Sequence, residues 1–300
     1  MLTGVMIWLF CPVNAQKLLS QADTSVNNRL MITAFDLKPQ VLAQSDLMVR
    51  LNLTLPGYFK TRNLLTGKME KLSDKVVLNE MTAAATVDYG LTPRLTLYAQ
   101  VPVSDIHHYS PMGEVSGKGF SDIGIGGYYN LAGNALSKNE FTANLSLFLP
   151  TGQNKNLTPA EYPLGMGVVR VKGALTGLYR MANSTLLYSG YYEFRPKNSS
   201  GVNLGDNMGL TLMKENYFNT SYGNFGLEYG VFSSYTMYDK KSGTKIIHSS
   251  DFSAGAFAGG FFEYLNKLYL RFDLPYNVYQ DGAFFTKYVV MVQLDYRFSL

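Results

Sequence analysis

The sequence is poor in cysteine, tryptophan and charged residues. Its 300 residues include one cysteine, one tryptophan and 16% charged residues. If a leader is cleaved after Ala15, the only cysteine, Cys11, is removed with it, and the mature chain can form no disulfide and use no thiol. The net charge of +4 is spread along the chain and forms no basic stripe, so nucleic acid is not expected as a partner.

Long apolar runs are also missing after the first residues. No later segment approaches the roughly twenty apolar residues of a membrane-spanning helix. At the start, an apolar core at 5–10 leads to a small-residue exit at Ala15, which predicts a secretory signal over residues 1–15 with Gln16 as the mature N-terminus. A basic stretch before the apolar core is missing, which fits a truncated start or an atypical leader, and a buried strand or helix is the alternative interpretation.

Tyrosine, phenylalanine and glycine are abundant instead. The chain has 22 Tyr, 18 Phe and 28 Gly, and its mean hydropathy of −0.04 is what alternating apolar and polar residues produce. Aromatic residues are typical of strands. Because a tilted strand needs about ten residues to cross a bilayer, a chain of this length suits one barrel and one domain.

The last residues show the clearest two-residue period. On one face, aromatic residues stand at both ends with aliphatic residues between them. A strand that crosses a bilayer needs this arrangement, because aromatic rings prefer the two interfaces and the hydrocarbon takes only alkyl groups. A soluble β-sandwich can produce the same alternation. The expected lipid-facing set is Tyr288, Val290, Val292, Leu294, Tyr296, Phe298 and Leu300.

The same period recurs upstream and predicts about twelve strands. In one of them, 250–265, glycines and phenylalanines occupy both faces, so the sequence leaves open whether Phe257 or Phe262 meets lipid. Inward glycines, such as Gly124 and Gly126, are expected to leave room for a pore or for a large neighbour. The predicted strands are 46–55, 80–89, 94–102, 120–131, 140–150, 166–181, 184–196, 206–218, 222–236, 250–265, 268–278 and 288–300.

Short and long connections alternate between these strands. This asymmetry is typical of a bacterial barrel with periplasmic turns at one end and extracellular loops at the other, and a sandwich has no reason to show it. The tight connections lie near 91–93, 182–183, 219–223 and 266–267, with 132–139 somewhat longer; the long ones are 56–78, 103–119, 151–165, 197–205, 237–249 and, least so, 279–285.

The predicted fold class is therefore all-β: a transmembrane antiparallel up-and-down β-barrel of about twelve strands in the outer membrane of a Gram-negative bacterium. The barrel takes residues 45–300, and 16–44 form an N-terminal periplasmic or plug segment. With an even strand count, both termini are expected in the periplasm. An apolar patch at Met31, Ile32 and Phe35 favours the plug, because it is poorly accommodated in free water.

Catalytic and metal-binding patterns are weak. All three histidines, His107, His108 and His248, fall in expected extracellular loops, where solvated residues are the better interpretation. A barrel hydrolase would need a serine within reach of a histidine that a polar partner orients. Ser250 follows His248 closely, yet histidines in loops are most often solvated surface residues. A metal site at His107 and His108, with Asp105 nearby, lacks further ligands at a persuasive spacing. We expect no enzyme activity, no metal and no cofactor.

Three segments resemble a known family. They are Asp88-Tyr-Gly-Leu-Thr-Pro-Arg-Leu-Thr-Leu-Tyr-Ala-Gln-Val-Pro102, Gly119-Phe-Ser-Asp-Ile-Gly-Ile-Gly-Gly-Tyr-Tyr-Asn-Leu131 and Leu147-Phe-Leu-Pro-Thr-Gly152. Together they are similar to the outer-membrane transporter family named for the meta-pathway of phenol degradation. The resemblance covers about residue 78 to the C-terminus, and it implies passage of small, often hydrophobic or aromatic molecules.

The strand phases also place a set of charges inside the barrel. Ionised groups cannot face hydrocarbon, and in a lumen they are most stable when paired and wetted. We therefore expect a belt of paired charges close to the periplasmic mouth, serving as a structural seal or as a selectivity filter. Its members are Asp88, Arg94, Glu140, Glu228, Glu263, Arg271, Asp273, Asp295 and Arg297.

These patterns favour a channel or transporter for a small-molecule solute. A structural or assembly barrel of an envelope complex is the alternative, and an outer-membrane hydrolase is a weaker one. The expected partners are outer-membrane lipid, the barrel-insertion machinery and the solute.

Overall fold

A computed structural model describes most of the barrel region and leaves out the N-terminal segment. The described residues are 41–62, 69–71, 77–110, 113–134, 137–154, 157–158, 160–198, 201–220, 223–246, 249–265, 267–281 and 284–299. The predicted signal at 1–15 and the apolar patch at 31–35 lie outside them. Within the described ranges, no helix has the length and hydropathy needed to cross a membrane.

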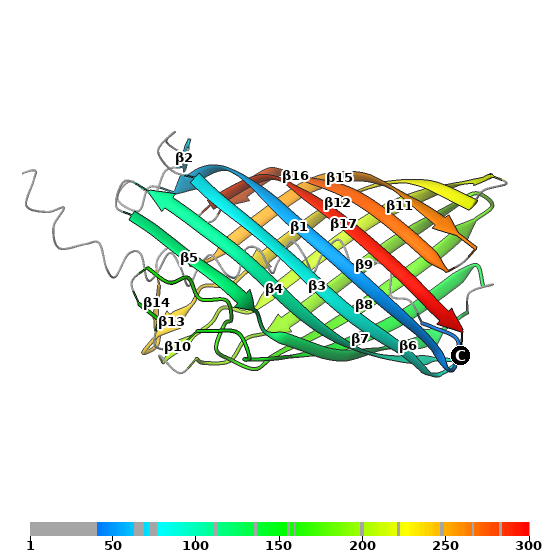
Figure 1. Cartoon of the computed structure of the whole chain (residues 1–300), viewed down its shortest axis with the longest axis horizontal. Helices are drawn as coiled ribbons and strands as arrows, with labels where there is room; N and C mark the ends of the chain where they lie inside the picture. The colour runs from blue at the N-terminus through cyan, green and yellow to red at the C-terminus, as the bar shows by residue number, and fades with distance from the viewer. Residues whose placement is uncertain are drawn as a thin grey trace, which may run out of the picture.

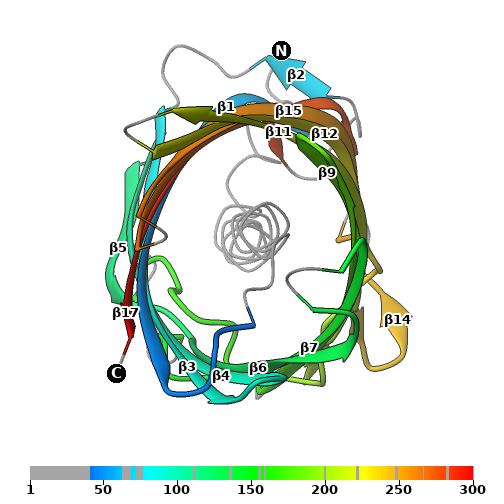
Figure 2. The same ribbon diagram turned by 90° about the vertical axis from the view of Figure 1, so that its right-hand side faces the viewer.

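Twelve long strands form one closed antiparallel sheet, seen along its axis in Figure 2. Consecutive barrel strands pair with each other, so the connectivity is up-and-down, as predicted. In order around the ring they are β1 (Asp46–Arg62), β3 (Val77–Thr92), β4 (Leu95–Ser110), β6 (Ile123–Ala132), β7 (Asn139–Leu149), β8 (Arg170–Met181), β9 (Ser184–Phe194), β11 (Asn207–Thr220), β12 (Gly223–Thr236), β15 (Asp251–Tyr264), β16 (Leu268–Asp281) and β17 (Phe284–Ser299).

The ring is closed by β1 and β17, which run side by side in Figure 1. Their register begins at Asp46 opposite Ser299 and passes Leu51 opposite Leu294. Closure gives every barrel strand two hydrogen-bonded neighbours, so no long edge has unpaired backbone groups in contact with hydrocarbon.

The two faces of the barrel wall differ in polarity as the alternation predicts. On β17, Leu294 and Tyr296 are 39% and 43% exposed, whereas Met291 and Asp295 between the outward positions are 0% and 2% exposed. The open question in β15 is also resolved: Phe257 is buried on the inner side. The outer wall is therefore an apolar band, and the inner wall carries most of the polar groups together with one apolar cluster that includes Phe257 and Met291.

The barrel has a turn end and a loop end. At the turn end, tight connections join β3 to β4, β8 to β9, β11 to β12 and β15 to β16. At the loop end lie the longer connections, the short connection between β16 and β17, and five short strands. These are β2 (Met69–Lys71), β5 (Gly113–Phe120), β10 (Val202–Asn203), β13 (Lys240–Lys241) and β14 (Thr244–Lys245).

Several predicted boundaries were wrong. The first strand was expected to end at 55, yet β1 continues to Arg62. Residues 103–119 were expected as a loop, yet β4 continues to Ser110 and pairs with β5, because alternation persists across this hairpin. Residues 166–169 belong to the connection before β8 rather than to the strand. The connection expected at 279–285 shrinks to 282–283, since both β16 and β17 extend further than their apolar runs suggest.

Inward glycines make room for large neighbours, which was one of the two expectations. A Cβ added at Gly126 would stand 2.7 Å from the Tyr98 ring, and one added at Gly124 would stand 3.2 Å from the Phe148 ring. These rings lie across the glycines on the lumen side of the wall, which is a common way to cover a glycine in a strand.

Candidate functional site: the charged lumen

Among the charged side chains on the lumen wall toward the turn end, seven form one group. They come from strands β1, β3, β11, β12, β16 and β17. These strands follow one another around the ring, apart from β15, which lies between β12 and β16 and contributes none of the seven. Each is buried, because two-residue alternation turns it away from the apolar outer face. We call this set the turn-end cluster: Arg50, Asp88, Glu215, Glu228, Arg271, Asp273 and Asp295.

Arg271 joins two carboxylates of this cluster. Its Nε lies 2.8 Å from Glu228 Oε1 and 2.7 Å from Asp273 Oδ2. The register explains why both reach it: Glu228 and Asp273 lie in one row on either side of Gly259, which has no side chain to separate them. An ideal Cβ on Gly259 would stand 2.0 Å from Asp273 Oδ1. The pairing therefore depends on a glycine in the intervening strand.

Arg50 makes the equivalent contacts on the neighbouring wall. Its Nη2 lies 3.3 Å from Asp88 Oδ2, and its Nε lies 3.8 Å from Asp295 Oδ1. Asp295 also accepts a 2.7 Å hydrogen bond from Gln293 Nε2. Glu215 extends the other side of the cluster, since it pairs with Glu228 in the register of β11 and β12 and accepts a hydrogen bond from the Tyr217 hydroxyl.

The nine residues of the predicted charge belt are placed as follows. Five belong to the turn-end cluster: Asp88, Glu228, Arg271, Asp273 and Asp295. Two form separate ion pairs at the turn end, Glu140 with Arg180 at 2.5 Å and Arg297 with Asp46. Glu263 accepts a 3.4 Å hydrogen bond from Asn224. Arg94 is exposed in the turn between β3 and β4, because it falls between the two strands.

A second group of charges was not predicted. We call it the loop-end cluster, and it consists of Asp122, Arg170, Lys172, Glu193 and Arg195. Arg170 Nη1 and Arg195 Nε lie 2.9 Å and 2.8 Å from the same oxygen, Glu193 Oε1. Arg170 Nη2 reaches Asp122 Oδ2 at 3.5 Å. Strand parity alone could have found Arg170 and Lys172, which share the inward face of β8.

Aromatic rings accompany the cations of the loop-end cluster. The Arg170 guanidinium carbon lies 4.5 Å from the centre of the Phe148 ring, and Lys172 Nζ lies 4.9 Å from the centre of the Tyr191 ring. Cations over ring faces at these distances are attracted by the ring quadrupole. The loop end of the lumen therefore combines positive charge with aromatic surface.

Asp122 fixes the connection between β7 and β8. Its carboxylate accepts N–H groups from Gly152 at 3.2 Å and Met166 at 3.0 Å, in addition to Arg170. Burial raises the pKa of Asp122, an effect that Arg170 and the two N–H groups oppose. One side chain thus holds both ends of this connection against the start of β6.

The same connection packs against the inner face of the β4–β5 hairpin. The Tyr162 N–H donates to Ser116 O at 2.7 Å, and Tyr162 and Leu164 form a small apolar core with Ile106. The Tyr162 ring also makes an edge contact with His108, whose Nε2 lies 2.6 Å from Glu80 Oε1. This segment covers part of the lumen wall at the loop end.

The two histidines that the structure describes, His107 and His108, are engaged by carboxylates. His107 Nε2 lies 2.9 Å from Asp105 Oδ1 and its Nδ1 lies 2.9 Å from Glu114 Oε1. In the part of the chain that the structure describes, no group of three His, Cys, Asp or Glu side chains is arranged to hold a metal ion. His248, the partner considered for Ser250, lies outside the described residues.

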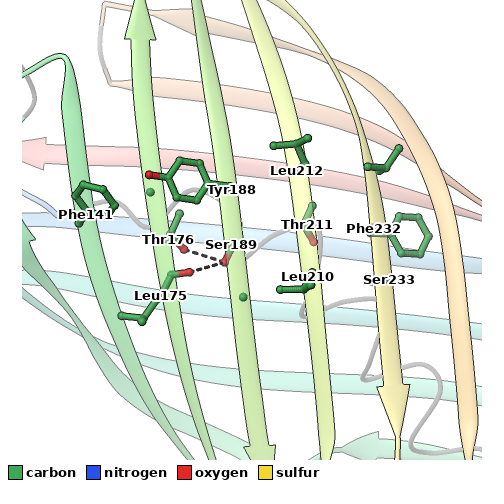
Figure 3. A pocket seen from close by; sticks show the side chains of 13 residues that line it. Phe141, Leu175, Thr176, Tyr188, Ser189, Leu210, Thr211, Leu212, Phe232 and Ser233 are labelled. Carbon is green, nitrogen blue, oxygen red and sulfur yellow. Dashed lines mark hydrogen bonds between the residues drawn. The ribbon is translucent and has the colours of Figure 1, made fainter.

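A shallow hollow of about 590 Å³ lies on strands β8, β9, β11 and β12, bordered by Phe141 of β7 (Figure 3). Its exposed side chains are outward-facing, with Leu175 and Leu210 exposed by 62% and 66%. Gly177 and Gly190 supply its floor. Because this is the apolar outer wall, the hollow faces the bilayer and not the lumen.

Comparisons with known proteins agree with this architecture. No protein-family model matches the sequence, and no curated protein does. An outer membrane channel from Pseudomonas putida F1 matches at a TM-score of 0.69 with 14% identity, over 86% of this chain and 97% of that one. The translocator domain of the autotransporter NalP from Neisseria meningitidis matches at 0.51 with 10% identity, over 96% and 100%.

These similarities show the fold class of the chain. The chain has the fold of an outer-membrane β-barrel with twelve strands. The resemblance to the family named for phenol degradation is matched by no family model, and it stays a prediction.

Proposed function

We propose that this protein is a channel in the outer membrane of a Gram-negative bacterium that passes small solutes. The observation that carries the proposal is the division of polarity across the wall: the closed barrel has an apolar outer face, and its lumen is lined largely by polar and ionisable side chains. A soluble barrel would place these faces the other way round. The similarity to an outer membrane channel supports the same proposal.

The lumen favours solutes that combine a ring with polarity. Stacked Tyr98 and Tyr128 rings, 5.0 Å apart, lie on the lumen side together with the rings beside Arg170 and Lys172. Aromatic surface of this kind suits small aromatic solutes, and the paired charges suit a polar substituent. This substrate class agrees with the one that the sequence resemblance implies.

We propose that the turn end lies in the periplasm with both termini, and that the loop end faces outward. The support is the length asymmetry of the connections, since bacterial barrels keep short turns on the periplasmic side. The proposed division of the chain is a signal at 1–15, an N-terminal segment at 16–44 and the barrel at 45–300. Its partners would be outer-membrane lipid, the insertion machinery and the solute.

Single-channel recording of the refolded chain from Gln16 tests the channel. Discrete conductance steps in a planar bilayer are the expected result. A silent bilayer with correctly folded protein would favour the alternative of an assembly barrel, and lipid hydrolysis by the same preparation would favour the hydrolase.

A further inference from the structure

Three short strands at the loop end form a small sheet of their own. β13 pairs with β10 on one side and with β14 on the other. The sheet joins two connections that lie apart in the sequence, 195–206 after β9 and 237–250 after β12. In Figure 2, β14 lies outside the ring of barrel strands and not over the lumen. The outer part of this sheet therefore projects beyond the wall, over the surrounding membrane surface.

The register of this sheet places three lysines in one row. Asn203 lies opposite Lys240, which in turn lies opposite Lys245, and a bridge sets Lys197 opposite Asn203. Residues that lie directly opposite each other in antiparallel strands share a face, so the row extends over three strand spacings, about 14 Å. We call Lys197, Lys240 and Lys245 the lysine row. Its two opposed lysines are like charges in direct apposition, which costs stability.

The positive charge of the lysine row is not neutralised by described carboxylates. All three side chains are exposed, and in the part of the chain that the structure describes none of them forms an ion pair. The two acidic residues of these connections hold backbone groups instead. Asp206 accepts the Arg195 N–H at 2.9 Å, and Asp239 accepts the Gly205 N–H at 2.7 Å. An anion bound along the row would relieve the repulsion.

Exposed aromatic residues show the depth at which the lysine row lies. Phe194 at the end of β9 is 51% exposed, and Tyr238 just after β12 is 39% exposed. Aromatic rings on the outer face of a barrel mark the membrane–water interface. Lys197 and Lys240 follow these two aromatics closely in the sequence, so their backbones lie within about 11 Å of them, and the Lys245 ammonium lies 5.0 Å from the centre of the Tyr238 ring. The row therefore lies at the level of the lipid headgroups.

We propose that the lysine row binds the phosphates of lipopolysaccharide in the outer leaflet of the membrane. The lipid A headgroup is a disaccharide with a phosphate at each end, so it presents separated anions to a row of separated ammonium groups. Its acyl chains then lie against the apolar outer wall. The proposal rests on the proposed outward orientation of the loop end, which the labelling of a cysteine at Lys241 tests separately.

The test is the binding of lipid A in mixed micelles to the refolded chain from Gln16, measured by titration calorimetry. Because a lysine near an anionic lipid surface contributes about fivefold in affinity, Lys240→Gln with Lys245→Gln should weaken binding at least about tenfold. Lys138→Gln with Lys267→Gln is the matched control, since it removes the same charge from exposed lysines at the turn end, and it should bind as the unchanged protein does. Without lipid A, the lysine-row variant should unfold at no lower temperature than the unchanged protein, because the substitutions remove a repulsion.

Three results would overturn the lipid site. Equal affinities of the lysine-row variant and the turn-end control would show that the row makes no specific contact. Equal affinities for lipid A with and without its phosphates would assign the binding to the acyl chains alone. Displacement of lipid A by an equal concentration of inorganic phosphate would make the row a site for free phosphate. A barrel that is silent in bilayers yet binds lipid A through the row would contradict the channel and leave the lipid site supported.

Discussion

At the scale of single residues, Arg271 is the side chain on which the turn-end cluster depends most. Removing it leaves Glu228 and Asp273 buried beside each other without their shared cation. We expect Arg271→Ala to lower the free energy of unfolding by roughly 3–5 kcal/mol and to shift permeation toward cations. Arg297→Ala should shift permeation in the same direction by a smaller amount. Urea titration and reversal potentials in a salt gradient measure the two effects, with exposed Arg94→Ala as the control. Lower stability with unchanged selectivity would make the cluster purely structural.

Gly259 gives a second prediction at this scale. A methyl group there would meet Asp273 Oδ1 at 2.0 Å and Phe272 O at 2.4 Å, so Asp273 must leave its position or the strand must shift. We expect Gly259→Ala to lower the midpoint of thermal unfolding. Gly173→Ala, on the outer face of β8 with no heavy atom within 4 Å of the added Cβ, should leave it unchanged. Equal effects of the two variants would mean that loss of glycine, and not the contact with Asp273, is responsible.

At the scale of elements, the turn end and the loop end must lie on opposite sides of the membrane. Lys241 lies in β13 at the loop end, and Asn183 lies in the turn between β8 and β9. A cysteine at Lys241 should react with an impermeant maleimide on intact cells, and one at Asn183 should react only after lysis. The reverse pattern would place the loops in the periplasm. Lys68, a further candidate for labelling, lies outside the described residues.

Strand positions could be predicted because a wall with lipid on one side imposes a two-residue period, as in β17. The strand ends could not be predicted, because they depend on pairing between neighbouring strands. Residues 113–120, for example, form β5 by pairing with β4. Parity also predicted inward charges such as Asp273 and Asp295. It could not predict that Arg271 serves two acids, since that depends on the register across Gly259. The loop-end cluster could not be predicted either. It forms because β8, β9 and the connection before β6 come together in space, and no local sequence pattern indicates such a contact.

At the scale of the whole molecule, closure by β1 and β17 should make the barrel resistant to detergent. Opening the ring requires the loss of the complete pairing between β1 and β17, which runs from Asp46 opposite Ser299 to Thr61 opposite Phe284. The protein should fractionate with outer membranes and migrate differently on a gel before and after boiling. Recovery in the soluble periplasm, with one migration position at both temperatures, would contradict a membrane barrel.

Permeation of solutes through the lumen is the central claim, and liposome swelling measures it most directly. Liposomes that contain the refolded chain from Gln16 are diluted into solutes of graded size and polarity, and empty liposomes serve as the control. We predict swelling with small solutes, faster for aromatic ones than for aliphatic ones of equal size, with rates that fall steeply as size increases. Swelling no faster than that of empty liposomes for every solute, from protein shown to be folded, would contradict the channel.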